Sequence, residues 1–282
     1  MAKLIAGIDY SPASVRALEA LIPIRKATKQ SIALYHAYQL PKGLPFLSAH
    51  VIEDMEMEAE KATQQKLRRF LHDTFPPADI QRVKIITQRD FLTDGLFRHL
   101  ETGKYILLAM GARGETETEK AAIGFHARHF IRHSPIPVLI TFPQTQVRWK
   151  RLLIAYHPNF HSPIGKRLLR LLTQKLVPSV AGVALLPPTP AIEKIHKKIR
   201  QQLTHGADYQ PVVWESVHLV RLLLETSRSY EADVIAYFSD PMHILPAMRS
   251  IPESEIDSQA AWLFFPSPNK ADSQDNGNDS LS

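Results

Sequence analysis

The sequence contains no cysteine and no apolar run long enough to cross a bilayer. The missing cysteine excludes disulfides, thiolate metal sites and a cysteine nucleophile. Glycine is scarce, with 11 residues against 21 prolines in a chain of 282. The amino terminus, MAKLIAGID, has one lysine before a short apolar run, which indicates a first core strand and no signal peptide. We therefore expect a cytoplasmic protein without a membrane segment.

Sequence patterns that mark common enzyme classes are also missing. The chain has no GxxxxGK[ST] loop, no GxSxG nucleophile elbow and no HExxH metal motif. Asp9 has no recognisable base or nucleophile partner, and a rate-enhancing site needs such a partner held in place. We expect no catalytic residues.

Charge is nearly balanced, with 34 basic and 28 acidic residues and a formal net charge of +6. The basic residues are spread through both halves of the chain. This balance is compatible with a phosphate-bearing ligand, an acidic partner or weak nucleic-acid contact. Because no nucleic-acid-binding module accompanies it, we do not expect nucleic-acid binding.

Short apolar runs alternate with helical patterns in the first half of the chain. Five runs predict strands: Leu4 to Ile8, Ile32 to Ala37, Val83 to Thr87, Tyr105 to Met110 and Ile136 to Phe142. Ser11-Pro12 predicts the start of a helix, because serine caps and proline fits the first helical position. This alternation predicts a doubly wound parallel sheet of class α/β. Ligands of such sheets bind at the carboxyl ends of the strands, where Asp9 and Gly111 stand.

The same order of elements starts again at Arg151, at a period of about 147 residues. The predicted strands are Leu152 to Tyr156, Val180 to Leu186, Val212 to Glu215, Asp233 to Phe238 and Ala260 to Phe265. Residues 144–149 are predicted to be a short polar connector. We therefore predict two tandem five-stranded domains, residues 1–147 and 150–266, and a disordered tail, residues 267–282.

The stretch from Lys104 to Phe142 predicts a strand, a glycine loop, a helix and a strand. Gly111 and Gly114 are followed by nine residues and then Gly124; Asp9 stands in GIDYSPAS, and HSPIPVLI leads into the last strand. On these residues the first half resembles the universal stress protein (UspA) domain. The whole chain resembles a tandem universal stress protein whose second domain is degenerate.

The resemblance implies an adenine-nucleotide fold, similar to that of the adenine nucleotide alpha-hydrolases, and a regulatory role in the stress response. In nucleotide-binding members the aspartate after the first strand contacts the nucleoside, the end of the second strand faces adenine, and the glycine loop holds the phosphates. The ligand implied is ATP, ADP or AMP with Mg²⁺, and slow ATP hydrolysis stays open. The implied cofactor-binding residues are Asp9, Ala37, Met110, Gly111, Arg113, Gly114, Gly124 and Phe125.

Two features depart from the family pattern. Phe125 stands where nucleotide-binding members carry a serine or threonine. The spacer before it carries Glu115, Glu117 and Glu119, whose charge disfavours a phosphate unless a divalent cation intervenes. The preferred interpretation of the spacer is a solvated acidic loop. The alternative function is therefore a nucleotide-free protein-interaction scaffold of the same fold.

The second half lacks the glycine pair. Tyr156 or His157 stands where Asp9 would repeat, and Pro241 and Pro246 are expected to break a helix after the fourth strand. We expect no nucleotide there. The resemblance implies instead that this half completes an intrachain pseudo-dimer, with residues 137–142 meeting residues 261–265. The protein partner and any further homodimer of tandem chains stay open.

Three histidines, His126, His129 and His133, recur on one predicted helix face. Arg128 and Arg132 lie between them and would repel a cation. We therefore interpret this face as basic and expect no metal.

Overall fold

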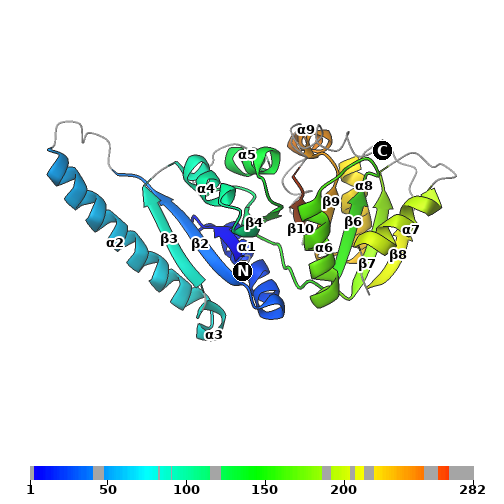
Figure 1. The fold of residues 1–282 in the computed structure, drawn as a ribbon, viewed down its shortest axis with the longest axis horizontal. Helices are drawn as coiled ribbons and strands as arrows, with labels where there is room; N and C mark the ends of the chain where they lie inside the picture. Colours follow the sequence, from blue (N-terminus) through cyan, green and yellow to red (C-terminus); the bar gives the residue numbers. More distant parts are fainter. Residues whose placement is uncertain are drawn as a thin grey trace, which may run out of the picture.

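The computed structural model describes residues 3–40, 48–81, 83–89, 91–114, 122–185, 192–203, 207–212, 219–250 and 260–266. These residues form one ten-stranded sheet in the order β3-β2-β1-β4-β5-β10-β9-β6-β7-β8, with helices on both faces (Figure 1). The α/β class and the doubly wound arrangement predicted from the sequence are confirmed. The predicted tail lies outside the described residues, and the exact limits of the two predicted domains stay predictions.

Five parallel strands make the first half of the sheet: β1 (Lys3–Gly7), β2 (Ser31–Tyr38), β3 (Val83–Arg89), β4 (Tyr105–Gly111) and β5 (Val138–Thr141). Its helices are α1 (Pro12–Thr28), α2 (Ala49–Thr74), α3 (Pro77–Ile80), α4 (Leu92–Glu101) and α5 (Phe125–His133). The charged helix α2 lies beside β3 at one end of the sheet and buries only Leu67 and Leu71 (Figure 1). A charged helix at this position leaves most of its surface to solvent.

The second half repeats this order with β6 (Arg151–Tyr156), β7 (Ser179–Ala184), β8 (Asp208–Val212), β9 (Val234–Phe238) and β10 (Ala261–Phe264). Its helical segments are α6 (Pro163–Lys175), α7 (Ile192–Leu203), α8 (Leu219–Tyr230), the 3₁₀ turn η2 (Pro241–His243) and α9 (Leu245–Ser250).

One expectation for the second half lies mostly outside the described residues, and another is wrong. Of the third strand expected at Val212 to Glu215, only Val212 is described, and it is the last residue of β8. The prolines do not prevent helical structure after the fourth strand. Pro241 opens η2 and Pro246 is the second residue of α9, where a backbone N–H has no intrahelical partner to lose.

The halves join through their fifth strands. β5 and β10 pair antiparallel, with Trp262 opposite Ile140 and Phe264 opposite Val138, whereas the other strand pairs are parallel. One antiparallel contact between two parallel half-sheets places the halves in opposite directions about a pseudo-twofold axis. The pairing expected from the family resemblance is confirmed.

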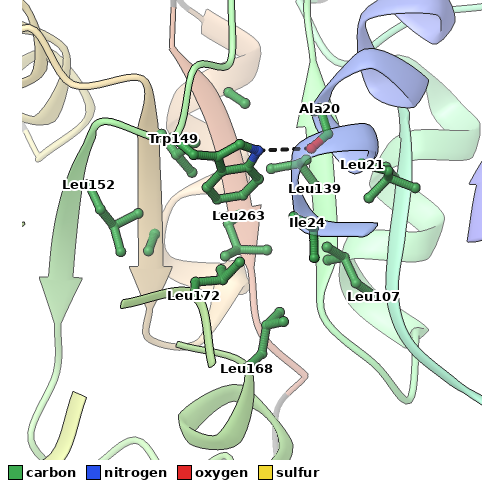
Figure 2. Packing of buried hydrophobic residues seen from close by; sticks show 14 of the residues in the cluster. Ala20, Leu21, Ile24, Leu107, Leu139, Trp149, Leu152, Leu168, Leu172 and Leu263 are labelled. Atoms are coloured by element: carbon green, nitrogen blue, oxygen red, sulfur yellow. Dashed lines mark hydrogen bonds between the residues drawn. The ribbon is translucent and has the colours of Figure 1, made fainter. Parts of the chain in front are cut away.

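The apolar layer under α1 and α6 continues across this join. Figure 2 shows Leu168 and Leu172 of α6 in one cluster with Ile24 of α1 and Leu139 of β5. Trp149 lies in the same cluster, 1% exposed, and its indole Nε1 donates a hydrogen bond to the carbonyl of Ala20 over 2.8 Å. The connector was expected to be polar. The structure differs, because its last residue, Trp149, belongs to the core.

Candidate functional site

A network of short hydrogen bonds fixes the turn from β1 into α1. Asp9 Oδ1 accepts from the Ser11 backbone N–H over 3.1 Å and from the Ser11 hydroxyl over 2.7 Å. The same Ser11 oxygen accepts from the Ser14 N–H over 3.2 Å, so it caps α1 as the sequence predicts. Tyr10, between them, takes a left-handed φ of 69°. The carboxylate of Asp9 therefore helps to hold the helix start in place.

The glycine loop comes to this helix start from β4. A Cβ atom at Gly111 would lie 3.0 Å from the Ala13 Cβ and from the Ser14 nitrogen. A Cβ atom at Gly114 would lie 3.1 Å from Asp9 Oδ2. Both glycines are therefore needed for close approach, and the structure brings them together with Asp9, as the sequence predicts.

Two backbone hydrogen bonds close the loop. The Ala112 N–H donates to the Thr141 carbonyl at the end of β5, and the Gly124 N–H donates to the Ala112 carbonyl, each over 2.8 Å. Gly124 therefore lies next to the end of β4, and it is the N-cap residue of α5. The spacer glutamates, Glu115, Glu117 and Glu119, lie outside the described residues.

The start of α5 has no side-chain cap. Its N-cap residue is Gly124, whereas serine hydroxyls cap α1 and α6. The first N–H groups of a helix have no intrahelical acceptor, and the helix dipole makes this end positive. The geometry therefore offers backbone donors for an anion beside the glycine loop.

Phe125 does not fill that space. Its side chain is 58% exposed, and its ring lies along α5, with its centroid 6.3 Å from that of His129 and 5.6 Å from that of His126. It is not among the residues that line the neighbouring cavity. The hydroxyl expected at this position is missing, but the phenyl ring does not block the loop.

A cavity of about 320 Å³ lies between the start of α1 and the glycine loop. Of the predicted residues, Arg113 and Gly114 line it. Ala37, at the half-buried end of β2, and Met110, which is buried, do not, so their predicted contacts stay predictions. The Ser-Pro helix start directly after Asp9 was a usable signal for the other lining residues, but sequence reasoning missed them. They are Tyr10, Ser11, Pro12, Ala13, Ala112, Ala122, Phe142 and Pro143.

Tyr10 anchors one wall of the cavity to β2 and α2. Its ring packs edge-on against His36 at 5.1 Å and Phe70 at 5.2 Å, and Lys66 Nζ lies 4.2 Å from the ring centroid. Burial raises the pKa of the Tyr10 hydroxyl. His36 Nδ1 lies 2.7 Å from the Ile8 carbonyl, and because a carbonyl only accepts, this nitrogen donates. His36 is thus a structural residue at the edge of the core.

The histidine face of α5 is crowded. The ring centroids of His129 and His133 are 4.8 Å apart. Burial, followed by the charge of His133, lowers the pKa of His129. Within the described part of the chain, no three histidine or acidic side chains are grouped closely enough to hold a metal ion.

The corresponding turn of the second half is built differently. The His157 N–H donates to the Phe238 carbonyl over 3.0 Å, and His157 Nδ1 accepts from the Asn159 N–H. After β9, Asp240 Oδ1 accepts from the Met242 N–H over 2.9 Å and caps η2. A carboxylate therefore occupies the position at which the first half offers free backbone donors. The expectation that this half holds no nucleotide stays a prediction.

Fold and site together define a duplicated, doubly wound α/β domain with a glycine loop at the carboxyl edge of its first half. The model of the universal stress protein family matches residues 1–141, which is half of the chain. The chain belongs to this family. No curated protein sequence matches the chain.

A solved structure of a universal stress protein shares the fold over nearly the whole chain. It comes from Archaeoglobus fulgidus DSM 4304 and has a TM-score of 0.61 at 17% identity. The match covers 95% of the present chain and 97% of the Archaeoglobus chain. UspA from Lactobacillus plantarum, at 14% identity and TM-score 0.38, covers 50% of this chain and 97% of its own. Another, at 19% identity and TM-score 0.36, covers 50% and 96% and was solved in complex with cAMP. None of the described helices of the present chain is long and apolar enough to span a membrane.

Proposed function

We propose that the first half binds an adenine nucleotide at the glycine loop, and that the chain acts in the cytoplasm as a non-catalytic regulatory protein of the stress response. The observation that carries this proposal is the close approach of Gly114 to Asp9. A Cβ atom added at Gly114 would lie only 3.1 Å from Oδ2 of Asp9. A side chain at this position would separate the loop from the aspartate. The close approach has a purpose if the loop backbone must reach a ligand phosphate.

The residues at the site suit the phosphate end of a nucleotide. The uncapped start of α5 supplies backbone donors, and Arg113 lines the cavity and can supply planar, charge-assisted donors. The cavity of about 320 Å³ lies at the lower end of the range, about 300–1,000 Å³, that is usual for ligand sites. In this proposal Mg²⁺ arrives with ATP, because the described residues provide no metal-binding cluster of their own.

Calorimetric titration with ATP, ADP, AMP and cAMP, with and without Mg²⁺, tests the proposal. Gly114→Val is expected to weaken nucleotide binding by at least about tenfold, because the added methyl groups push the loop away from Asp9. An unchanged affinity in this variant contradicts the proposed site.

Phe125→Ser restores the hydroxyl typical of nucleotide-binding members and is expected to tighten ATP binding by about three- to tenfold, the range of one additional hydrogen bond. Phe91→Ser is the matched control, since Phe91 is also exposed, at 66%, and also stands at a helix start. Equal changes in the two variants would show that exposed phenylalanine, and not the phosphate loop, governs the effect.

A nucleotide-free interaction scaffold is the second candidate. Two observations favour it: Asp9 Oδ1 is already engaged by Ser11, and Phe125 presents an exposed ring. Absence of heat and of a thermal shift at millimolar nucleotide, together with recovery of a specific protein partner that depends on Phe125, would support this candidate over nucleotide binding.

A further inference from the structure

A second cleft lies between the halves and not at the glycine loop. It has a volume of about 900 Å³ and opens between α6 and the amino-terminal end of β4. None of its lining residues belongs to the glycine-loop cavity. The strands of the two halves run in opposite directions. The start of α6 in the second half therefore lies near the amino-terminal end of β4 in the first half.

One side of this interdomain cleft is apolar. Ile164, Leu168 and Leu171 recur at helical spacing on one face of α6, and Tyr105 and Ile106 contribute from β4. Leu168 reaches down into the shared core seen in Figure 2. The apolar side of the cleft is therefore continuous with the packed layer that joins the halves and is held rigidly by it.

The rim of the cleft is basic. Lys104 stands at the start of β4, and Lys166, Arg167 and Arg170 lie along α6. No aspartate or glutamate is among the described residues that line the cleft. Arg170 Nε donates to the Gln202 carbonyl at the end of α7 over 2.7 Å, which fixes this guanidinium on the rim. Positive charge is thus concentrated on the rim, and the described lining residues supply no carboxylate to balance it.

Two further observations indicate that an anion with a hydrogen-bond donor would suit the cleft. Burial, and then the charges of Lys198 and Arg170, lower the pKa of Lys166, so the ammonium ion is disfavoured where it stands. An anion at the rim would relieve this repulsion. Gln30 also lines the cleft, and its side-chain oxygen is buried without a hydrogen-bond partner in the structure. A ligand hydroxyl or amide would satisfy it.

We propose that the interdomain cleft is a second ligand site, which binds a small amphipathic anion such as a phosphate monoester with an apolar body. The anionic group contacts Lys166 and Arg167 on the rim, and the apolar body lies on Ile164, Leu171 and Tyr105. Arginine and lysine provide the donors that phosphate oxygens require, while the aliphatic wall rewards burial of an apolar chain. A ligand at this place touches both halves, and its binding is therefore linked to the way they pack.

Calorimetric titration of the full chain with n-octyl phosphate, ethyl phosphate, inorganic phosphate and 1-octanol tests both parts of the ligand. Octyl phosphate is expected to bind at least about tenfold tighter than ethyl phosphate, because six more methylene groups are buried. Both the neutral alcohol and the inorganic ion are expected to bind more weakly than octyl phosphate. Equal affinity for octyl phosphate and inorganic phosphate, or no binding of octyl phosphate below about 1 mM, would overturn the proposal.

The variant Arg167→Glu locates the anion, because it reverses a rim charge. It is expected to weaken octyl phosphate binding by at least about tenfold. Lys175→Glu is the matched control: it makes the same charge change on the same helix at an exposed residue outside the cleft. An equal loss in both variants would show a general charge effect and would overturn the assigned site. Gly114→Val is expected to leave octyl phosphate binding unchanged, so failure of nucleotide binding and failure of this proposal remain distinguishable.

Discussion

Gly114 and Gly182 show how a missing side chain determines what a neighbouring residue can do. At Gly114 the space is used by the Asp9 carboxylate, which lies 3.1 Å from the Cβ position. At Gly182 the ring of Tyr209 occupies the Cβ position, and its hydroxyl lies 2.6 Å from His196 Nδ1. Burial raises the pKa of Tyr209 well above its usual value of 10, which keeps this hydroxyl protonated. The glycine in β7 therefore supports a buried histidine–tyrosine pair.

This pair predicts an acid-sensitive stability. His196 is 8% exposed, and burial lowers its pKa below the usual value of 6.5. The unfolded chain takes up a proton near pH 6.5 while the folded chain does not, so stability falls as pH decreases below about 6.5. Urea unfolding at pH 7.5 and 5.5 is expected to show a smaller loss in His196→Gln than in the parent chain, by up to about 1 kcal/mol.

His243→Gln is the control for this measurement, because His243 is exposed. It is expected to keep the pH dependence of the parent chain. If both variants show the same slope as the parent chain, His196 does not contribute to the acid sensitivity.

Among the elements, the connector between the halves departs most from its sequence pattern. Gln144 to Trp149 is mostly polar, yet Trp149 lies in the core and bonds α1 through its indole nitrogen. Trp149→Phe removes this donor and part of the buried area, and is expected to cost about 1–3 kcal/mol of unfolding free energy. Chemical denaturation measures the loss. Phe91→Leu, at an exposed site, is expected to cost less than about 0.5 kcal/mol; a similarly small cost at Trp149 would contradict the structural role of the connector.

The positions of most other elements could be predicted because their signals are local. Apolar runs marked nine of the ten described strands closely, and the Ser11-Pro12 pair marked the start of α1. The third strand expected in the second half overlaps the described residues only at Val212, the last residue of β8. The expectation that prolines would break a helix after the fourth strand is wrong, because Pro246 falls in the first turn of α9.

At the scale of the whole molecule, the halves share one apolar layer in addition to the β5–β10 pairing. Unfolding one half would expose Leu139, Leu263 and the leucines of α6 together. We therefore expect a single calorimetric transition, with equal calorimetric and van't Hoff enthalpies. Two resolved transitions in the parent chain would contradict this coupling. Trp149→Ala, which opens a cavity at the join, is expected to lower the ratio of van't Hoff to calorimetric enthalpy or to separate the transitions.

The sequence alone determined the α/β class, the duplication and the family spacing of Gly111, Gly114 and Gly124, because periodicity and motif spacing are properties of the chain. Only the tertiary structure decided where the Phe125 ring lies, that Asp9 is engaged by Ser11, and that a basic cleft opens between the halves. These features depend on contacts between segments far apart in the chain. The antiparallel pairing of β5 and β10 brings Lys104 and Arg167 to the rim of one cleft, and a local sequence pattern cannot predict this proximity.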